Sequence, residues 1–226
     1  MIDKRDILQG NPLMVGLPAE ALDALLAKCR LRRLVDGEYL YRQHEAGEAM
    51  YGVLEGRIRL SNSSRDGREL LVMLVERGDW IGEVSLFDGE PRSHDAYAVG
   101  DSLLLMISRA DLDSLLEAQP QLYRYFLPML CRKLRLALSY VEVAALYPLS
   151  ARLALRLLDL QAHYSAGDGE VMVPQEDLAK MLAVSRQAVS RELKRLEKAG
   201  VIALAYGKVC VLDSDALRRE AEGGAV

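Results

Sequence analysis

Between Leu34 and Ile107, short aliphatic runs alternate with polar corners that contain glycine. Nine glycines divide this stretch, and neighbouring ones lie no more than eleven residues apart. Two of the apolar runs, residues 50–60 and 69–75, flank the corner Asp66-Gly67, which is suited to a hairpin turn. Short β-prone segments with regular turns are typical of antiparallel sandwiches and barrels. The pattern therefore predicts a β-roll over this part of the chain.

Helical spacing of apolar positions occurs on both sides of the predicted roll. Before the roll, apolar residues from Leu22 to Cys29 follow Pro18, which favours the opening of a helix. After the roll, Ser108 is a suitable N-cap for a helix over residues 109–117. We expect the first helix to pack across the roll.

The segment that follows keeps helical character up to Tyr147-Pro148 and repeats apolar residues at alternating spacings of three and four. This repeat is the seam pattern of a two-stranded coiled coil, although a helix that packs on its own domain also produces it. Its position between two domains favours dimerisation. Pro128 predicts that the helix starts or bends at this residue, so that the seam begins just after it. The expected dimer contacts are Leu127, Leu130, Leu134, Ala137, Val141 and Ala144.

The C-terminal part contains two short predicted helices joined by a turn. An amphipathic helix over residues 149–164 comes first, and residues 175–202 then read as a helix, a turn at Ala183-Val184 and a second helix. Ser185 is suited to cap this second helix. Residues 201–212 read as a hairpin. This order of elements predicts a helix-turn-helix followed by a wing.

The second helix of this pair carries the side chains that DNA recognition needs. Arginine can bond guanine through two atoms, glutamine can do the same with adenine, and serine contacts either kind of base edge. Residues 186–208 hold six basic and two acidic residues, although the whole chain has a net charge of -4. A solvated basic face would explain the charges alone, but a capped helix, a basic face and a wing together favour DNA binding. The predicted DNA contacts are Ser185, Arg186, Gln187, Ser190, Arg191, Lys194 and Lys208.

Length and composition narrow the class of protein. The chain has 226 residues, of which 50% are hydrophobic and 27% charged, as in a globular protein large enough for two domains. Its three cysteines lie far apart and predict neither a disulfide framework nor a metal cluster. The sequence contains no signal-peptide pattern and no apolar run long enough to span a membrane. We expect a cytoplasmic protein without a metal site and without membrane contact.

A second motif lies between Trp80 and Ser93 and reads as a strand, one helical turn and a return bent by glycine and proline. Backbone amides at the start of the helical turn can hold a phosphate, Arg92 can grip it through two parallel bonds, and Ser93 adds a hydroxyl. Glu83 fits this site if it accepts a bond from a ribose hydroxyl or neutralises Arg92. The alternative is a structural ion pair between Glu83 and Arg92. His94 is a ligand, a pH switch or a structural residue.

These motifs resemble those of the cyclic-AMP receptor protein and fumarate-nitrate regulator (CRP/FNR) family of bacterial transcription factors. The resemblance covers nearly the whole chain. It rests on Gly82-Glu83, Pro91-Arg92-Ser93, Arg132-Lys133-Leu134 and the segment Ser185 to Arg191. Gln187 replaces the Glu that is common in the family, which implies an altered half-site.

The resemblance implies an α+β protein with three parts. These are an N-terminal β-roll of the cyclic-nucleotide-binding, double-stranded jelly-roll type over residues 1–118, a dimerisation helix over 119–146 and a C-terminal winged helix-turn-helix domain over 147–226. The expected partners are a second copy of the chain, double-stranded DNA with a palindromic operator, and RNA polymerase.

The resemblance also implies roles for the residues of the second motif. In cyclic-AMP-binding members, the glutamate contacts the ribose hydroxyl and the Arg-Ser pair holds the cyclic phosphate. Where those members read adenine with Thr and Ser, an ungapped comparison places Ala137 and Leu138. Cyclic AMP, cyclic GMP and a cyclic dinucleotide therefore stay open as effectors, and no cofactor is certain. The expected ligand residues are Gly82, Glu83, Val84, Ser85, Arg92, Ser93, Ala137 and Leu138.

The sequence thus predicts a transcription regulator gated by a small effector. The alternative is a regulator with a vestigial nucleotide pocket that acts without a ligand or responds to a redox or protein signal. A regulatory module without a DNA-binding domain is disfavoured by residues 186–198 and the wing. An enzyme that uses Glu83 and His94 as acid and base is disfavoured because no nucleophile with a partner accompanies them, so we expect no catalytic residues.

Overall fold

The computed structural model describes residues 18–164 and 170–223. The first 17 residues and the predicted loop over 165–169 lie outside this range. The described chain divides into two compact units, and the division falls after Leu136, inside the long helix α5 (Tyr123–Leu146).

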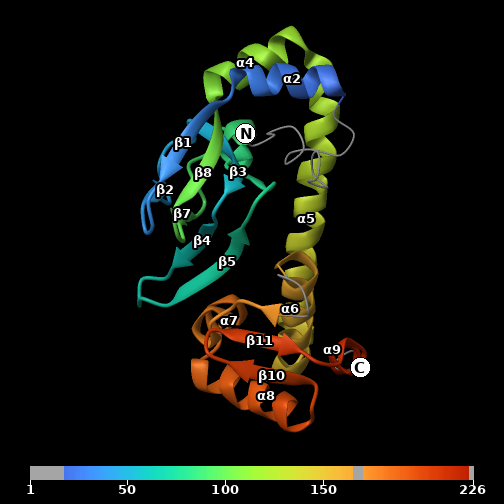
Figure 1. Ribbon diagram of the computed structural model, residues 1–226. Coiled ribbons are helices and arrows are strands. Elements are labelled where there is room, and N and C mark those ends of the chain that lie inside the picture. The colour runs from blue at the N-terminus through green and yellow to red at the C-terminus, as the bar shows by residue number, and fades with distance from the viewer. Residues whose placement is uncertain (1–17, 165–169, 224–226) are drawn as a thin grey trace. The chain divides into compact units, whose positions relative to one another are not determined.

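The N-terminal unit is built on two four-stranded sheets (Figure 1). One sheet has the strand order β1-β8-β3-β6 and the other has the order β2-β7-β4-β5. Apart from β4 and β5, which are neighbours in one sheet, strands that follow each other in sequence lie in different sheets, as in a roll, so the predicted β-roll is confirmed. The strands are β1 (Arg30–Leu34), β2 (Tyr39–Tyr41), β3 (Ala49–Glu55), β4 (Ile58–Ser63), β5 (Glu69–Val75), β6 (Trp80–Ile81), β7 (Asp95–Ala98) and β8 (Ser102–Ser108).

Short helices close this unit. They are α2 (Ala19–Lys28), α3 (Glu83–Asp88) and α4 (Arg109–Ala118). Helices α2 and α4 lie side by side (Figure 1), and Leu22 and Leu112 from them share one buried cluster with Trp80. Ser108 caps α4 as predicted, because its hydroxyl accepts a bond of 3.1 Å from the amide of Asp111.

Helix α5 follows a single 3-10 turn over Pro120–Leu122 and runs for 24 residues. The prediction that the helix starts at Pro128 is wrong, because Pro128 lies inside α5. Proline has no N–H, so Pro128 cannot donate the helical hydrogen bond to the carbonyl of Arg124. Both residues are exposed, so water can bond this carbonyl instead. The helix therefore continues through the proline on its solvent side.

The C-terminal unit combines four further helices with a three-stranded sheet of order β10-β11-β9 in the described chain. The helix pair, its turn and the hairpin agree with prediction, whereas β9 and α9 were not predicted. The elements are α6 (Leu149–Tyr164), β9 (Glu170–Val171), α7 (Gln175–Leu182), α8 (Arg186–Lys198), β10 (Ile202–Ala205), β11 (Lys208–Val211) and α9 (Ser214–Glu222).

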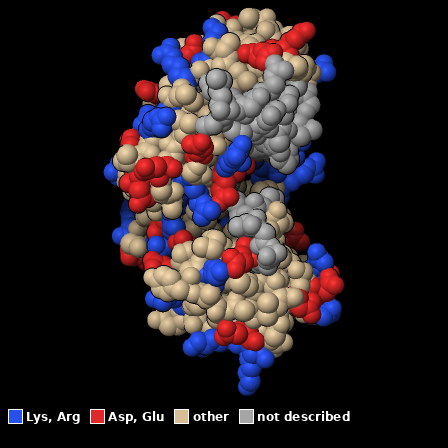
Figure 2. Space-filling view, viewed as in Figure 1, with Lys and Arg blue, Asp and Glu red and all other residues tan. Residues whose placement is uncertain are grey.

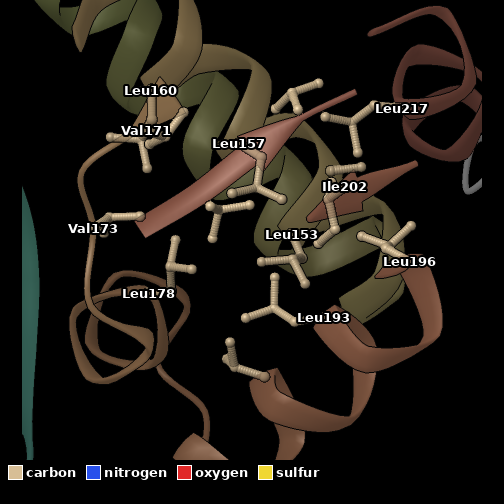
Figure 3. Packing of buried hydrophobic residues seen from close by; sticks show 14 of the residues in the cluster. Leu153, Leu157, Leu160, Val171, Val173, Leu178, Leu193, Leu196, Ile202 and Leu217 are labelled. Carbon is tan, nitrogen blue, oxygen red and sulfur yellow. The ribbon is translucent and has the colours of Figure 1, made fainter. Parts of the chain in front are cut away.

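The core of this unit forms where α6, α8 and the sheet meet (Figure 3). Leu153 and Leu157 of α6 point toward Leu193 of α8 and Ile202 of β10 (Figure 3), and all four side chains are fully buried. These contacts cover one face of α8 with apolar side chains. The opposite face of α8 is left to polar residues.

Candidate effector site and DNA-binding helix

The predicted ligand motif begins at Gly82, between β6 and α3. Gly82 has a φ of 88°, in the left-handed region. A Cβ atom at this position would lie 2.8 Å from Nη1 of Arg92 and 3.0 Å from the carbonyl oxygen of Ala49. Only glycine supplies both this backbone conformation and this space. The turn therefore brings the backbone directly against Arg92.

The side chain of Arg92 is buried, with 3% of its surface exposed, and bonds the backbone around it. Nη1 donates to the carbonyl of Gly82 at 2.8 Å, and Nη2 donates to the carbonyl of Ala49. The guanidinium lies over the ring of Tyr41, 4.2 Å from its centroid. Burial raises the pKa of the Tyr41 hydroxyl and Arg92 partly opposes the rise, so this ring stays neutral. Arg92 is thus held in a fixed position, while its Nε has no hydrogen-bond partner in the described chain.

Glu83 is also buried, with 2% of its surface exposed, and its partner comes from α5. Nζ of Lys133 donates to Oε1 of Glu83 at 2.5 Å and to the carbonyl of Trp80 at 2.9 Å. The alternative of an ion pair between Glu83 and Arg92 is therefore wrong, because Lys133 supplies the cation and carbonyl oxygens take the guanidinium. Sequence reasoning missed this role of Lys133 because the contact joins residues 50 positions apart.

The other predicted ligand residues have different environments. Ser85 is buried, with its hydroxyl 3.5 Å from the carbonyl of Pro91, whereas Val84 is exposed. Ala137 and Leu138 are exposed on α5. The structure thus brings Gly82, Glu83 and Arg92 together and adds Lys133 and Tyr41, which the sequence did not single out.

Ser93 and His94 follow Arg92 directly. The hydroxyl of Ser93 is exposed and lies 2.7 Å from Nδ1 of His94. Burial lowers the pKa of the His94 imidazole, and the carboxylate of Asp95 partly opposes this shift. A neutral imidazole in contact with an exposed hydroxyl therefore follows Arg92 directly in the chain.

Helix α8 presents its polar face as the sequence predicts. The hydroxyl of Ser185 accepts a bond of 3.2 Å from the amide of Ala188 and so caps the helix. Ser190 is half-buried. The exposed residues of the predicted set on α8 are Arg186, Gln187, Arg191 and Lys194.

The charges on this face differ in how far they are paired. Arg186, Arg191 and Lys194 form no ion pair with any described residue, whereas Arg195 binds Glu192 at 3.0 Å and also binds Glu220. Figure 2 shows Lys and Arg side chains projecting from the C-terminal unit in the region where Figure 1 places α8. Arg186, Arg191 and Lys194 belong to the predicted contact set, and their charge is available to phosphates.

The wing is the hairpin of β10 and β11. Its two-residue turn places Tyr206 fully exposed beside Gly207, whose φ is 69°. Nζ of Lys208 lies 2.5 Å from Oε1 of Glu170 in β9, and this bond raises the pKa of Lys208 and lowers that of Glu170. The charge of Lys208, a predicted DNA contact, is therefore offset locally.

Helix α5 carries the predicted dimer contacts. Leu130 is half-buried and packs against the N-terminal core. Leu134 is 60% exposed and Val141 66% exposed, and Leu127, Ala137 and Ala144 are exposed as well. A stripe of exposed apolar side chains along one helix is the surface that a partner helix would cover.

The described residues contain neither a membrane-spanning helix nor a cluster of metal ligands. No helix in this part of the chain is long and apolar enough to cross a membrane. No group of three or more His, Cys, Asp or Glu side chains in the same residues could hold a metal ion.

Comparison with known proteins agrees with both halves of the structure. The cyclic nucleotide-binding domain family matches residues 31–119, and the Crp-like helix-turn-helix domain family matches residues 151–220. The cyclic AMP receptor protein of Thermus thermophilus is 32% identical over 96% of this chain and 99% of its own length. The CRP-like cAMP-activated global transcriptional regulator of Mycobacterium tuberculosis is 25% identical over 96% of this chain and 99% of its own.

A solved structure of a transcription regulator is also similar to this chain. The crystal structure of a CRP/FNR-family transcriptional regulator from Thermus thermophilus has a TM-score of 0.72 and 27% identity, and the match covers 87% of this chain and all of that chain. A nucleotide-type sensor joined to a helix-turn-helix domain defines the class of effector-gated, DNA-binding transcription regulators. This chain belongs to that class and to its CRP/FNR family.

Proposed function

We propose that the effector of this regulator is a cyclic nucleotide held by Glu83, Arg92 and Ser93. The observation that carries the proposal is a pair of buried polar atoms of opposite charge, Oε2 of Glu83 and Nε of Arg92, each without a partner among the described residues. Buried polar atoms in proteins are nearly always hydrogen-bonded. A ligand with both an anionic group and a hydroxyl donor satisfies this pair.

A cyclic nucleotide carries these two groups. Its ribose hydroxyl can donate to the carboxylate of Glu83, and its cyclic phosphate can accept bonds from Arg92 and Ser93. Because Lys133 already binds Glu83 from α5, a ligand at this carboxylate changes the contact that ties α5 to the sensor. The site thus links effector binding to the helix that leads to the DNA-binding domain.

Calorimetric titration of the purified protein with cyclic AMP, cyclic GMP and cyclic di-GMP tests this proposal. We expect saturable heat with one of them and its loss in Arg92→Ala. Arg68→Ala is the control, because Arg68 is an exposed arginine in the turn between β4 and β5 that pairs with Asp66. Silence from every nucleotide would overturn the proposal and favour the alternative regulator whose pocket is vestigial.

We further propose that a homodimer formed through the exposed stripe of α5 binds a palindromic operator. The contacts come from Ser185, Arg186, Gln187, Ser190, Arg191 and Lys194 of each copy, with a smaller part for Lys208 because Glu170 offsets its charge. The free cations of α8 support this assignment. A regulator of this class works in the cytoplasm and contacts RNA polymerase at its promoters.

The DNA contacts are tested by measuring duplex affinity over a range of salt concentrations. Arg191→Ala is expected to relax preference for the operator by about 1–3 kcal/mol and to reduce the salt slope by about one. Arg218→Ala is the control, because Arg218 lies on α9 and is paired with Asp215 at 2.7 Å. Unchanged preference in Arg191→Ala would remove this residue from the recognition surface.

A further inference from the structure

We propose that His94 is a further effector-positioning residue, which orients the hydroxyl of Ser93 toward the phosphate of the effector. This proposal rests on the proposed cyclic nucleotide site. The observation behind it is the 2.7 Å contact between Oγ of Ser93 and Nδ1 of His94, two residues that directly follow the buried Arg92.

The contact has two chemical forms, and only one of them suits an anion. If Nδ1 is unprotonated, the Ser93 hydroxyl donates its single hydrogen to the imidazole and offers an incoming phosphate only lone pairs. If Nδ1 carries the proton, the imidazole donates to Oγ and the hydroxyl hydrogen is free to bond the phosphate. Binding of an anion therefore selects the Nδ1–H form, in which His94, Ser93 and the phosphate form a chain of hydrogen bonds.

The backbone around this contact is fixed from two sides. On one side the amide of Arg92 donates to the carbonyl of Glu45, and the amide of His44 donates to the carbonyl of Arg92, both at 2.8 Å. On the other side Nδ2 of Asn62 in β4 donates to the carbonyl of Ser93 at 3.3 Å. The hydroxyl is thus presented by a backbone that does not have to reorganise when the ligand binds.

The next residue along the chain is tied down as well. Oδ1 of Asp95 accepts a bond of 2.8 Å from the amide of Gln43, so its carboxylate is already engaged beside the imidazole. Asn62 keeps a buried Oδ1 that has no partner in the described chain. The Asp95 carboxylate and the Ser93 carbonyl are therefore already bonded within the protein.

Three substitutions of His94 separate the positioning role from a structural one. An asparagine amide lies as many bonds from Cα as Nδ1 of histidine, whereas the glutamine amide reaches the position of Nε2. We expect His94→Ala to weaken binding of the responsive cyclic nucleotide about tenfold, His94→Gln to behave like alanine, and His94→Asn to stay within about threefold of the original protein. A residue that only fills space would not make this distinction.

A double-mutant cycle completes the test. If His94 acts through Ser93, the double variant Ser93→Ala/His94→Ala binds no more weakly than Ser93→Ala alone, because the chain of bonds is already broken. Thermal unfolding of each variant shows that it is folded. Equal affinities of His94→Ala and the original protein, or additive losses in the double variant, would overturn the proposal.

The proposed function is judged separately in the same series through Arg92→Ala. If the original protein binds a cyclic nucleotide and Arg92→Ala does not, the effector site stands, whatever the His94 variants do. If the original protein binds none of cyclic AMP, cyclic GMP and cyclic di-GMP, both the effector site and the role of His94 are refuted.

Discussion

At the scale of single residues, the effector site depends on a glycine as much as on its charges. Gly82 and Gly89 both have left-handed backbone, with φ of 88° and 77°, and alanine in that region costs about 1–2 kcal/mol at either position. At Gly89 an added Cβ meets nothing within 4 Å, whereas at Gly82 it lies against Arg92 and Ala49. The two positions therefore share the backbone cost and differ only in the contact with the site.

We predict that Gly82→Ala abolishes effector binding and that Gly89→Ala preserves it. The added Cβ displaces the Arg92 guanidinium, so Gly82→Ala should also lower the free energy of unfolding by about 1–3 kcal/mol more than Gly89→Ala does. Calorimetric titration and chemical denaturation measure these two effects. Equal behaviour of the two variants would mean that Arg92 tolerates displacement from the Gly82 carbonyl.

The imidazole of His94 predicts how effector affinity depends on pH. Burial lowers its pKa below the ordinary value of 6.5 in the free protein, with Asp95 opposing the shift. A bound phosphate favours the imidazolium and so raises this pKa, which means that binding takes up a proton. Affinity should rise as the pH falls below the pKa of the complex and level off below the pKa of the free protein. Titrations from pH 8 to pH 5.5 measure this rise, and His94→Asn should show none.

Candidate site residues could be identified from the sequence where they are neighbours in a short motif. Gly82-Glu83 and Arg92-Ser93 form short motifs that are visible in the sequence, and their roles toward a ligand stay predictions. The partners Lys133 and Tyr41 were not predictable, because they reach the site through the packing of α5 and β2. The sequence thus indicates candidate ligand-binding groups better than it indicates what holds them in place.

At the scale of elements, the turn before α8 contains a strained residue. Ala183 ends α7 in the left-handed region, with a φ of 54°. Glycine adopts this conformation without the steric cost of Cβ. We predict that Ala183→Gly stabilises the C-terminal domain by about 1 kcal/mol, because the steric cost of Cβ is removed. The larger conformational entropy of glycine in the unfolded chain reduces this gain. Calorimetric melting measures the gain, and Ala199→Gly, at a position with a φ of -79°, should give a loss.

Helix α5 yields a prediction about assembly. Leu134 belongs to the exposed apolar stripe, and Ser139 lies two positions beyond Ala137 on the opposite side of the heptad. We predict that Leu134→Glu gives a monomer, because a dimer would bury an unpaired carboxylate, while Ser139→Glu leaves the dimer intact. Sedimentation equilibrium measures the mass. A Leu134→Glu protein that remains dimeric would place the interface elsewhere.

Elements with strong local signals were predicted well. The caps at Ser108 and Ser185 mark where α4 and α8 begin, because a side-chain oxygen satisfies an amide within the same turn. Strand β9 and helix α9 were not predicted. β9 has two residues and owes its place to pairing with β11, and pairing across such a distance leaves no local pattern. Pro128 does not start α5, because the effect of a proline depends on exposure, which the sequence does not show.

At the scale of the whole molecule, a regulator of this class couples two binding sites in different domains. Thermodynamic linkage requires that an effector which raises DNA affinity by some factor is itself bound more tightly, by the same factor, when DNA is present. Lys133 of α5 forms an ion pair with Glu83, the carboxylate of the proposed effector site. Among the described residues, this ion pair joins that carboxylate to the helix that leads out of the sensor unit. A change at this ion pair should therefore alter the coupling factor more than it alters the affinity for the effector alone or for DNA alone.

We predict that the coupling factor, within the usual range of about 5 to 150, shrinks toward one in Lys133→Met, while operator binding without effector stays near that of the original protein. Arg135→Met is the control, because Arg135 is an exposed cation two residues further along α5. Four affinities are measured. They are the affinity for the effector with and without operator duplex, and the affinity for the duplex with and without effector. Undiminished coupling in Lys133→Met would show that the signal leaves the sensor by contacts other than this ion pair.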